Sequence, residues 1–254
     1  MIMVLSGTKD GREVVKLLLE CGYPLIVTTA TTYGASLIEK KELCTVIPKK
    51  LSKKEMEKLI VNKKIKLLID ATHPYAEEVS ENAMKACENT NIIYYRYERK
   101  KSKIDVYKEI IQYVPSYEKA VEKLKDFKGN ILLTTGSKTL EMFANCLDES
   151  RLFPRVLPVS DVIKKCEMLK IKPSNIIAMQ GPFSMEMNME MIKKYKIDIL
   201  VSKESGNMGG TLEKLEAAKK MKIPVLLIER PKIEYKNILS SVEDLMNKVS
   251  EIYG

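Results

Sequence analysis

The sequence predicts an α/β protein with two doubly wound parallel-sheet domains. Short apolar runs without alternation recur along the chain, and each leads into a small polar turn and then a helical pattern. A length of 254 residues and a hydrophobic share of 45% allow two cores of ordinary size. The same order of strand, turn and helix restarts after Lys128, so we expect Rossmann-like domains over residues 1–128 and 129–254.

The first predicted domain alternates strands with helices. We expect strands over residues 1–5, 24–28, 43–47, 65–69 and 92–97, and helices over 11–21, 52–62 and from about 75 to 89. Residues 103–115 are interpreted as irregular or edge strands that lead out of this domain. Ser116 has the position and chemistry of an N-cap for the next helix.

The second predicted domain repeats this order. Strands are expected over residues 131–135, 156–158, 176–180 and 197–202, with 224–229 as the final strand. Ligands of such sheets bind beyond the carboxyl ends of the strands, and domain interfaces favour pockets. We therefore expect the two domains to face a shared cleft.

Composition narrows the classes of partner. The chain has 43 Lys and Arg against 34 Asp and Glu, a net charge of +9, but its lysines are dispersed and it has 4 Phe and no Trp to stack on bases. We therefore expect no nucleic acid as partner and favour a multiply anionic small molecule. No apolar run reaches the length of a membrane helix, and residues 1–5 are too short for a signal peptide, so no membrane association and a cytoplasmic location are expected. Monomer and homodimer both stay open.

Cysteine and histidine usage argues against a metal site. The five cysteines are far apart without a C-x-x-C motif, and His73 is the only histidine. We expect reduced, mostly buried thiols and no bound metal.

The first glycine turn is a candidate cofactor site. It reads Leu5-Ser6-Gly7-Thr8-Lys9-Asp10-Gly11-Arg12 and matches neither G-x-G-x-x-G nor the P-loop. Its hydroxyls, glycines and cations nevertheless suit a pyrophosphate, so the candidate residues are Ser6, Gly7, Thr8, Lys9, Gly11 and Arg12.

The second strand ends in hydroxyl groups. Thr28 and Thr29 stand where an NAD-binding domain usually carries an acid for the ribose hydroxyls. Hydroxyls can accommodate a 2′-phosphate, so we favour NADPH over NADH and add both threonines to the candidate cofactor-binding residues.

His73 follows the fourth predicted strand in the segment Asp70-Ala71-Thr72-His73-Pro74-Tyr75. Its imidazole can donate a proton or bind a ligand near neutral pH, and Thr72 and Pro74 beside it are expected to contact the cofactor. The alternative is a turn histidine fixed by Pro74. No G-x-S-x-G elbow accompanies it, which disfavours hydrolysis.

Cations and small polar residues lie at successive strand ends of the second half. Such groups suit a ligand with several carboxylates, although any single cation can simply be a solvated surface residue. The candidate substrate-binding residues are Gly136, Ser137, Lys138, Arg155, Gln180, Gly181, Pro182, Phe183, Ser184, Lys203, Ser205, Gly206, Gly209, Gly210 and Thr211.

Several segments, in this order, resemble the precorrin-6A reductase family. They are Ser6–Arg12, Asp70-Ala71-Thr72-His73-Pro74-Tyr75-Ala76, Leu133-Thr134-Thr135-Gly136-Ser137, Arg155-Val156-Leu157-Pro158, Gln180-Gly181-Pro182-Phe183-Ser184, Lys203-Glu204-Ser205-Gly206 and Gly209-Gly210-Thr211. The second and fifth of these segments are specific, the match spans nearly the whole chain, and Ser6 departs from the glycine expected in many relatives.

The resemblance implies an enzyme of cobalamin biosynthesis. Such an enzyme uses hydride from NADPH or NADH to reduce a double bond near ring D of precorrin-6A or cobalt-precorrin-6A. The cations of the second domain would then bind the acetate and propionate arms of this tetrapyrrole, and His73, a nearby Tyr or solvent would supply the proton. The alternatives are a non-catalytic binding protein for an anionic nucleotide or sugar-phosphate, and another tetrapyrrole-pathway enzyme such as a methyltransferase.

Overall fold

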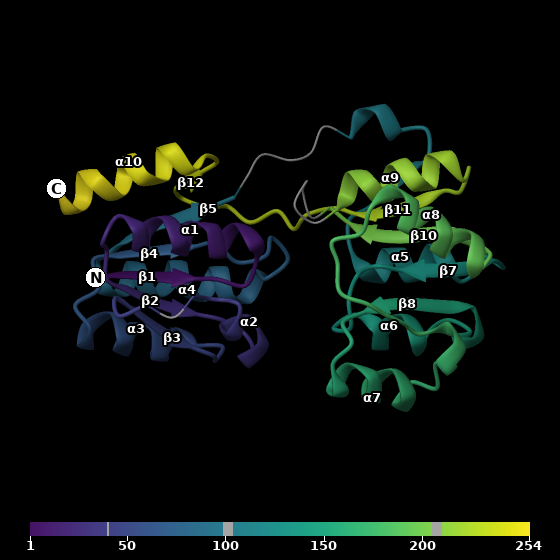
Figure 1. Cartoon of the computed structure of the whole chain (residues 1–254), viewed down its shortest axis with the longest axis horizontal. Helices are drawn as coiled ribbons and strands as arrows, with labels where there is room; N and C mark the ends of the chain where they lie inside the picture. The colour runs from purple at the N-terminus through teal and green to yellow at the C-terminus, as the bar shows by residue number, and fades with distance from the viewer. Residues whose placement is uncertain (40, 99–103, 205–209) are drawn as a thin grey trace. The chain divides into compact units, whose positions relative to one another are not determined.

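The chain forms two compact α/β units, each built around one six-stranded sheet (Figure 1). The computed structural model describes residues 1–39, 41–98, 104–204 and 210–254. Unit 1 comprises Met1–Lys100 and Lys232–Gly254, and unit 2 comprises Lys101–Pro231. Two doubly wound α/β units were predicted from the sequence, and that fold class is confirmed.

Unit 1 has the strand order β12-β5-β4-β1-β2-β3, with parallel pairing throughout. From the central β1, the chain adds β2 and β3 on one side of the sheet. It then adds β4, β5 and finally β12 on the other side. The strands are β1 (Ile2–Leu5), β2 (Leu25–Thr28), β3 (Cys44–Ile47), β4 (Leu67–Asp70), β5 (Ile93–Tyr97) and β12 (Ile238–Leu239).

Helices cover both faces of the unit 1 sheet. Ile2 and Val4 of β1 belong to a core with α1 (Lys9–Glu20) and α10 (Val242–Tyr253), whereas Met3 and Leu5 belong to a core with α3 (Lys53–Asn62) and α4 (Glu77–Thr90). The short α2 (Thr32–Ser36) follows β2. Because both faces are covered, every residue of β1 is buried, which explains why this strand is apolar without alternation.

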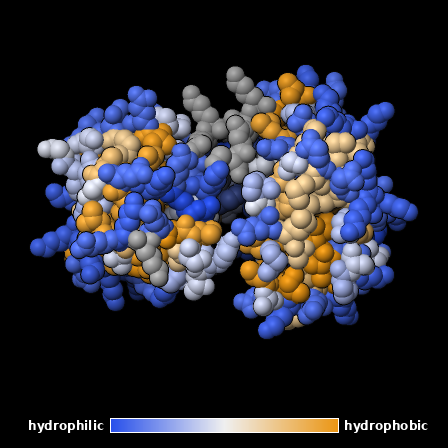
Figure 2. All heavy atoms as spheres, viewed as in Figure 1, coloured by the Kyte–Doolittle hydropathy of each residue, from blue (hydrophilic) through white to orange (hydrophobic). Residues whose placement is uncertain are grey.

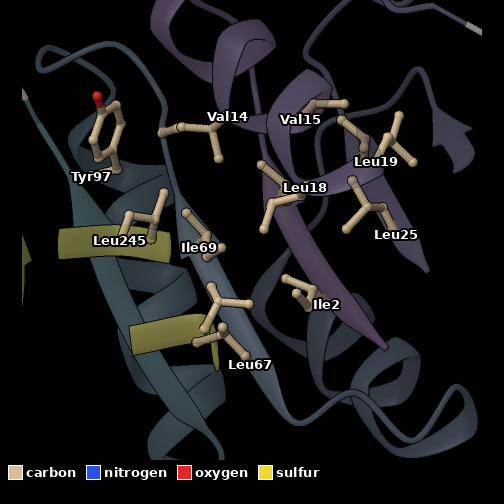
Figure 3. Packing of buried hydrophobic residues seen from close by; sticks show 14 of the residues in the cluster. Ile2, Val14, Val15, Leu18, Leu19, Leu25, Leu67, Ile69, Tyr97 and Leu245 are labelled. Carbon is tan, nitrogen blue, oxygen red and sulfur yellow. The ribbon is translucent and has the colours of Figure 1, made fainter. Parts of the chain in front are cut away.

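Figure 3 shows the first of these cores. Ile2, Leu67 and Ile69 extend from the strands toward α1, which contributes Val14 and Leu18. Leu245 of α10 completes the same cluster with a fully buried side chain.

Unit 2 repeats the topology in the order β6-β11-β10-β7-β8-β9, again with parallel pairs. The strands are β6 (Ile111–Val114), β7 (Asn130–Leu133), β8 (Leu152–Val156), β9 (Ile177–Ala178), β10 (Ile197–Lys203) and β11 (Val225–Ile228). The helices are α5 (Tyr117–Leu124), α6 (Leu140–Ala144), α7 (Ser160–Met168), α8 (Met185–Lys194) and α9 (Thr211–Lys220), with short 3₁₀ turns at Asp105–Tyr107, Glu149–Arg151 and Pro173–Asn175. Side chains of α8 and α9 fill one core with Leu132, Leu200 and Val225.

The units divide at other positions than the predicted boundary near residue 128. Residues 103–115 were expected to lead out of the first domain, but β6 pairs with β11 and so belongs to unit 2. The C-terminal segment was assigned to the second domain, but β12 pairs with β5, and Leu245 and Val249 of α10 are buried in unit 1. Residues 224–229 are therefore not the final strand. At one edge of the unit 1 sheet, β12 from the C-terminal segment pairs with β5. At the corresponding edge of the unit 2 sheet, β6 from the start of that unit pairs with β11.

Figure 2 shows hydrophilic side chains interspersed with apolar areas on the visible face of both units.

The cysteines are less buried than expected. Of the five cysteines, all free, only Cys87 and Cys166 are buried, so the expectation of mostly buried thiols is wrong. Among the described helices, none is long and apolar enough to cross a membrane.

Candidate functional sites at the strand ends

The first candidate site lies where the winding of the unit 1 sheet reverses. β1 and β4 are neighbours, with Leu5 beside Asp70, yet their following helices belong to opposite faces of the sheet. The loops after them, residues 6–8 and 71–76, therefore diverge at this point. We call them the switch-point loops, because ligands of doubly wound sheets bind at such a position. Ser6, Gly7, Thr8, Thr72, His73 and Pro74 lie in these loops, as predicted strand-end residues should.

Thr8 ties the two switch-point loops together. Its hydroxyl Oγ1 donates a hydrogen bond to the carbonyl oxygen of Ala71 at 3.0 Å and accepts one from the backbone N–H of Gly11 at 2.9 Å. Thr8 is thus the N-cap of α1, a helix of 12 residues. The amino end of this helix is fixed against the loop that follows β4.

Gly11 allows α1 to lie close to β1. A Cβ atom at this position would be 2.8 Å from the Oγ of Ser6 and 3.0 Å from the carbonyl oxygen of Ala71. Ser6, Thr8 and Gly11 have the spacing of the three glycines in G-x-G-x-x-G, in which the third glycine permits close packing of helix and strand. Gly11 keeps that packing role although serine and threonine replace the other two glycines.

This turn fits a dinucleotide pyrophosphate. The Oγ of Ser6 is buried and has no hydrogen-bond partner among the described residues, a condition that usually marks an unfilled interaction. Gly7 is exposed, and a Cβ there would meet nothing within 4 Å, so a ligand can approach its backbone. The amino end of α1 adds partial positive charge, and Lys9 and Arg12 lie in its first turns.

The ends of β2 and β3 are adjacent. Thr28 and Thr29 are buried, and the Thr29 hydroxyl donates to the Thr31 carbonyl oxygen at 2.9 Å, so it is used within the turn. The Thr29 N–H donates to the carbonyl oxygen of Ile47 at 3.1 Å, which places Lys49 and Lys50 after the neighbouring strand. Both lysines are exposed, and Lys49 pairs with Glu55. Both lysines follow β3 beside the end of β2.

Asp70 is the centre of a buried network under the His73 loop. Its carboxylate accepts hydrogen bonds at 2.6–3.0 Å from the Thr72 backbone and hydroxyl, Ser80, Tyr94 and Arg96. Burial by itself would lower the pKa of Arg96. The negative charges of Asp70 and Glu98 have the larger effect, so the pKa of Arg96 is raised. Thr72, predicted to contact the cofactor, uses its hydroxyl in this network.

His73 is half-buried, and its ring accepts a hydrogen bond from the backbone. Its Nδ1 accepts a hydrogen bond from the Tyr75 N–H at 3.3 Å, and its carbonyl oxygen accepts from the N–H of Ala76 at 2.8 Å. In the neutral ring this contact places the proton on Nε2. This contact fits a histidine that is fixed within the turn, and in the neutral ring the donor nitrogen is Nε2.

The second candidate site lies at the corresponding reversal in unit 2, between β7 and β10. After β7 the chain turns through Gly136, with φ of +89°, and the Thr139 hydroxyl donates to the Thr135 hydroxyl at 2.9 Å. Ser137 and Lys138 follow in this loop, and Lys138 is exposed.

Arg155 is buried and has no acidic partner among the described residues. Its Nη1 donates to the Oδ1 of Asn188 at 2.7 Å, and the guanidinium lies 4.1 Å from the Phe183 ring centroid. Burial lowers the pKa of Arg155 to about 10, so it stays charged near neutral pH. It lies within β8, whereas the strand was predicted over 156–158; the structure begins the strand at Leu152 and includes Pro154.

The Gln180–Ser184 segment supports Arg155. Ser184 caps α8 by accepting from the Met187 N–H at 3.2 Å, and α8 carries Asn188. A Cβ on Gly181 would be 3.0 Å from the Phe183 ring. Gln180, Gly181 and Pro182 themselves are exposed.

Two lysines complete a group of four cations, which we call the basic cluster: Lys138, Arg155, Lys203 and Lys214. Burial, followed by the charge of Lys138, lowers the pKa of Lys203 to about 8. Lys214 of α9 is buried and donates to the Oγ of Ser202 at 2.9 Å. Lys214 was not predicted from the sequence, because a lysine within a helix ordinarily lies on the solvated face.

The remaining candidates of unit 2 are only partly described. Gly210 is the N-cap of α9 with φ of +66°, and Thr211 is its buried first residue. Ser205, Gly206 and Gly209 lie outside the described residues. In the part of the chain that is described, no three His, Cys, Asp or Glu side chains are grouped as metal ligands.

Two Rossmann-like units, one with a dinucleotide-type first turn and one with a basic cluster at its strand ends, are typical of an oxidoreductase that acts on an anionic substrate. The chain belongs to the family described as "Precorrin-6x reductase CbiJ/CobK", whose profile matches residues 1–250.

Individual relatives agree with this family. The chain is 39% identical over 250 residues to a cobalt-precorrin-6A reductase of Priestia megaterium, with 97% of each chain covered. It is 36% identical to a cobalt-precorrin-6A reductase of Methanothermobacter thermautotrophicus, covering 99% of this chain and 84% of the relative. A solved structure, "CobK precorrin-6A reductase", has a TM-score of 0.81 at 22% identity, covering 98% of this chain and 96% of that chain, which supports the fold.

Proposed function

We propose that this protein reduces cobalt-precorrin-6A, or the cobalt-free precorrin-6A, with hydride from a reduced nicotinamide. The cobalt-containing substrate is favoured because the two relatives above 35% identity named here are both cobalt-precorrin-6A reductases. The observation that carries the proposal is the unpartnered, buried Ser6 hydroxyl beside the close contact of Gly11 with β1. That combination fits a pyrophosphate at the switch-point loops.

Residues of unit 1 hold the cofactor in this proposal. The Ser6 hydroxyl, the Gly7 backbone and the amino end of α1 bind the pyrophosphate, and Lys9 and Arg12 add charge. When bound, the reduced nicotinamide supplies the hydride. Thr8 keeps both switch-point loops in one arrangement through its bond to Ala71.

NADPH is the proposed form of the cofactor. Thr28, at the end of β2, offers a hydroxyl where an acid would repel a 2′-phosphate, and Lys50 supplies positive charge at the end of the adjacent strand. Lys49 is less available because it pairs with Glu55 at 2.5 Å.

Residues of unit 2 bind the substrate. Acetate and propionate arms make the tetrapyrrole a polyanion, and Arg155 and Lys203 bind carboxylates with charge-assisted hydrogen bonds. Asn188 and Phe183 hold the Arg155 guanidinium by two different contacts, a hydrogen bond and a stacked ring. A guanidinium fixed in this way loses little conformational entropy when it binds a carboxylate.

His73 is proposed to donate the proton that balances the reduction. Addition of hydride to one atom of the double bond leaves an electron pair on its neighbour, which then takes a proton. The hydrogen bond from Tyr75 to Nδ1 directs the donor role to Nε2. The Asp70 network holds the loop that carries this ring.

The test is anaerobic incubation of the purified protein with each reduced nicotinamide and each macrocycle. We expect loss of the nicotinamide absorbance, faster with NADPH and with cobalt-precorrin-6A. Failure to oxidise either nicotinamide with both macrocycles would show that the protein is not this reductase. Tight binding of a phosphorylated ligand without oxidation would favour the non-catalytic alternative, and binding of a methyl donor would favour the methyltransferase.

A further inference from the structure

Lys214 is a buried amine that has no acidic partner among the residues the structure describes. Its side chain is 5% exposed, and its Nζ bonds to the Ser202 Oγ at 2.9 Å, which accounts for one of its three protons. No carboxylate lies within ion-pair distance of it in the described structure, and residues 205–209, which precede α9, contain no Asp or Glu in the sequence. A buried ammonium group normally has a partner that compensates for lost hydration.

Positive charge surrounds Lys214 instead. Burial, then Arg155 and then Lys203 lower its pKa to about 7, and Glu213 opposes them in part. Lys138 acts on Lys203 in the same direction. Glu213, on α9 itself, has a buried Oε2 without a hydrogen-bond partner among the described residues, so it does not serve as a paired counter-ion.

Arg155 contributes unused donors to the same region. Its Nη1 bonds to Asn188, but its Nε and Nη2 groups make no hydrogen bond within the described residues. Arg155 as a whole is 9% exposed, so it is not a solvated surface cation. Two largely buried cationic groups therefore have donor capacity that no described residue uses.

We propose that Arg155 and Lys214 form a carboxylate-binding site in unit 2, and that Lys214 takes up a proton when the carboxylate binds. The inference rests on the proposed function, because the carboxylate is an acetate or propionate arm of the tetrapyrrole. Without a ligand, loss of the Lys214 proton relieves the repulsion within the basic cluster. A bound carboxylate replaces that repulsion with attraction, so the ammonium form becomes the stable one.

A pH dependence of binding follows. Above about pH 7 the free protein must acquire a proton at Lys214 before it can make the ion pair, so affinity falls by up to tenfold per pH unit. Below that pH the lysine is already charged, and this contribution becomes constant. The pKa of Lys203 is about 8, one unit higher, so Lys203 also takes up protons when a carboxylate binds, but fewer than Lys214 does.

The experiment is calorimetric titration with a stable porphyrin that carries acetate and propionate arms. Measurements in two buffers of equal pH, near 8, but different ionisation enthalpy give the number of protons taken up per porphyrin. We expect the Lys214→Met variant to take up close to one proton fewer than the native protein and to bind at least tenfold more weakly. Lys220→Met, which removes an exposed lysine from the same helix, is the matched control and should behave as the native protein.

Two further measurements make the outcome decisive. The first is NMR of the native protein with ¹³Cε-labelled lysine. Without porphyrin, the chemical shift of one lysine should change with a midpoint near pH 7, and with porphyrin bound this change near pH 7 should disappear. The Lys214→Arg variant should bind porphyrin with the reduced proton uptake of the Met variant. No porphyrin binding, equal uptake by native and Met variants, or no lysine that titrates near pH 7 overturns the inference. Oxidation of NADPH by the native enzyme tests the proposed function separately, because proton uptake on binding requires no reduction.

Discussion

Arg96 and Asp70 form a fully buried ion pair, with Nη1 of the arginine 2.9 Å from Oδ1 of the carboxylate. Both side chains are 0% exposed, and the pair lies at the strand end from which the His73 loop departs. Arg96 also bonds to Glu98 at 2.9 Å and stacks on the ring of Tyr235, 5.0 Å away. Tyr235 belongs to the C-terminal segment of unit 1, so this segment packs against the buried network that supports the candidate proton donor.

Arg96→Met should strongly destabilise unit 1. It leaves the Asp70 carboxylate buried without its cation, a change that typically costs about 3–5 kcal/mol. Urea unfolding measures the loss. Lys85→Met, which breaks the exposed pair with Glu81, is the control and should change stability by less than about 0.5 kcal/mol. A similar small effect for Arg96→Met would contradict the structural role of this pair.

Gly11 and Gly7 should respond differently to alanine. At Gly11 the new Cβ meets Ser6 and the Ala71 backbone at 2.8 and 3.0 Å, so Gly11→Ala should lower stability by about 1–3 kcal/mol and weaken cofactor binding. At Gly7 nothing lies within 4 Å, so Gly7→Ala should fold normally and weaken only cofactor binding. Thermal unfolding and NADPH titration separate the two effects. Native-like NADPH affinity in both variants would place the cofactor elsewhere.

His73→Ala should lower kcat by about 10²–10⁴-fold if Nε2 donates the proton, with little change in the KM for NADPH. His73→Asn is the informative control, because its Oδ1 can accept the hydrogen bond of the Tyr75 N–H but cannot donate as an imidazole does. Stopped-flow rates across pH give the comparison. Recovery of native turnover by the asparagine variant would assign His73 to the turn alone.

The choice of nicotinamide should depend on Thr28 and Lys50. Thr28→Asp places a negative charge at the end of β2, and Lys50→Ala removes a positive one from the end of β3. Each change should raise the KM for NADPH by about tenfold, equivalent to roughly 1.4 kcal/mol, and leave NADH less affected. Steady-state kinetics with both cofactors measures this, with Lys54→Ala on the exposed face of α3 as control. An equal effect on NADH would disprove the 2′-phosphate assignment.

Lys214 should make the ligand-free protein more stable at alkaline pH. Its pKa is lowered to about 7 in the folded chain from 10.5, so between these values the unfolded chain binds a proton that the folded chain does not. The free energy of unfolding therefore rises with pH through this window. Native protein should gain stability relative to Lys214→Met from pH 7 to 10.5 in urea unfolding, whereas Lys220→Met should track the native curve. Parallel curves for native and Lys214→Met would show that Lys214 is charged throughout.

Local sequence patterns predicted the strands and turns but not their assignment to units. The apolar run of Ile2–Leu5 identifies a strand buried on both faces, and Ser52 and Ser116 cap the helices that were expected after them. By contrast, β12 has only two residues, too few for a periodic signal, and its partner strand β5 lies more than a hundred residues away. Pairing between such distant segments is decided by the packing of α10 on the unit 1 core.

The sequence by itself determined that the candidate residues of both sites lie at strand ends. Ser6, Gly7 and Thr8, and also Lys203, follow or end predicted strands, and parallel strands necessarily bring such residues to the same edge of a sheet. Only the tertiary structure decided which polar groups are buried and what pairs with them. Asn188, Arg96 and Lys214 gain their importance from burial and from distant partners, and local periodicity cannot encode a contact between side chains that lie far apart in the chain.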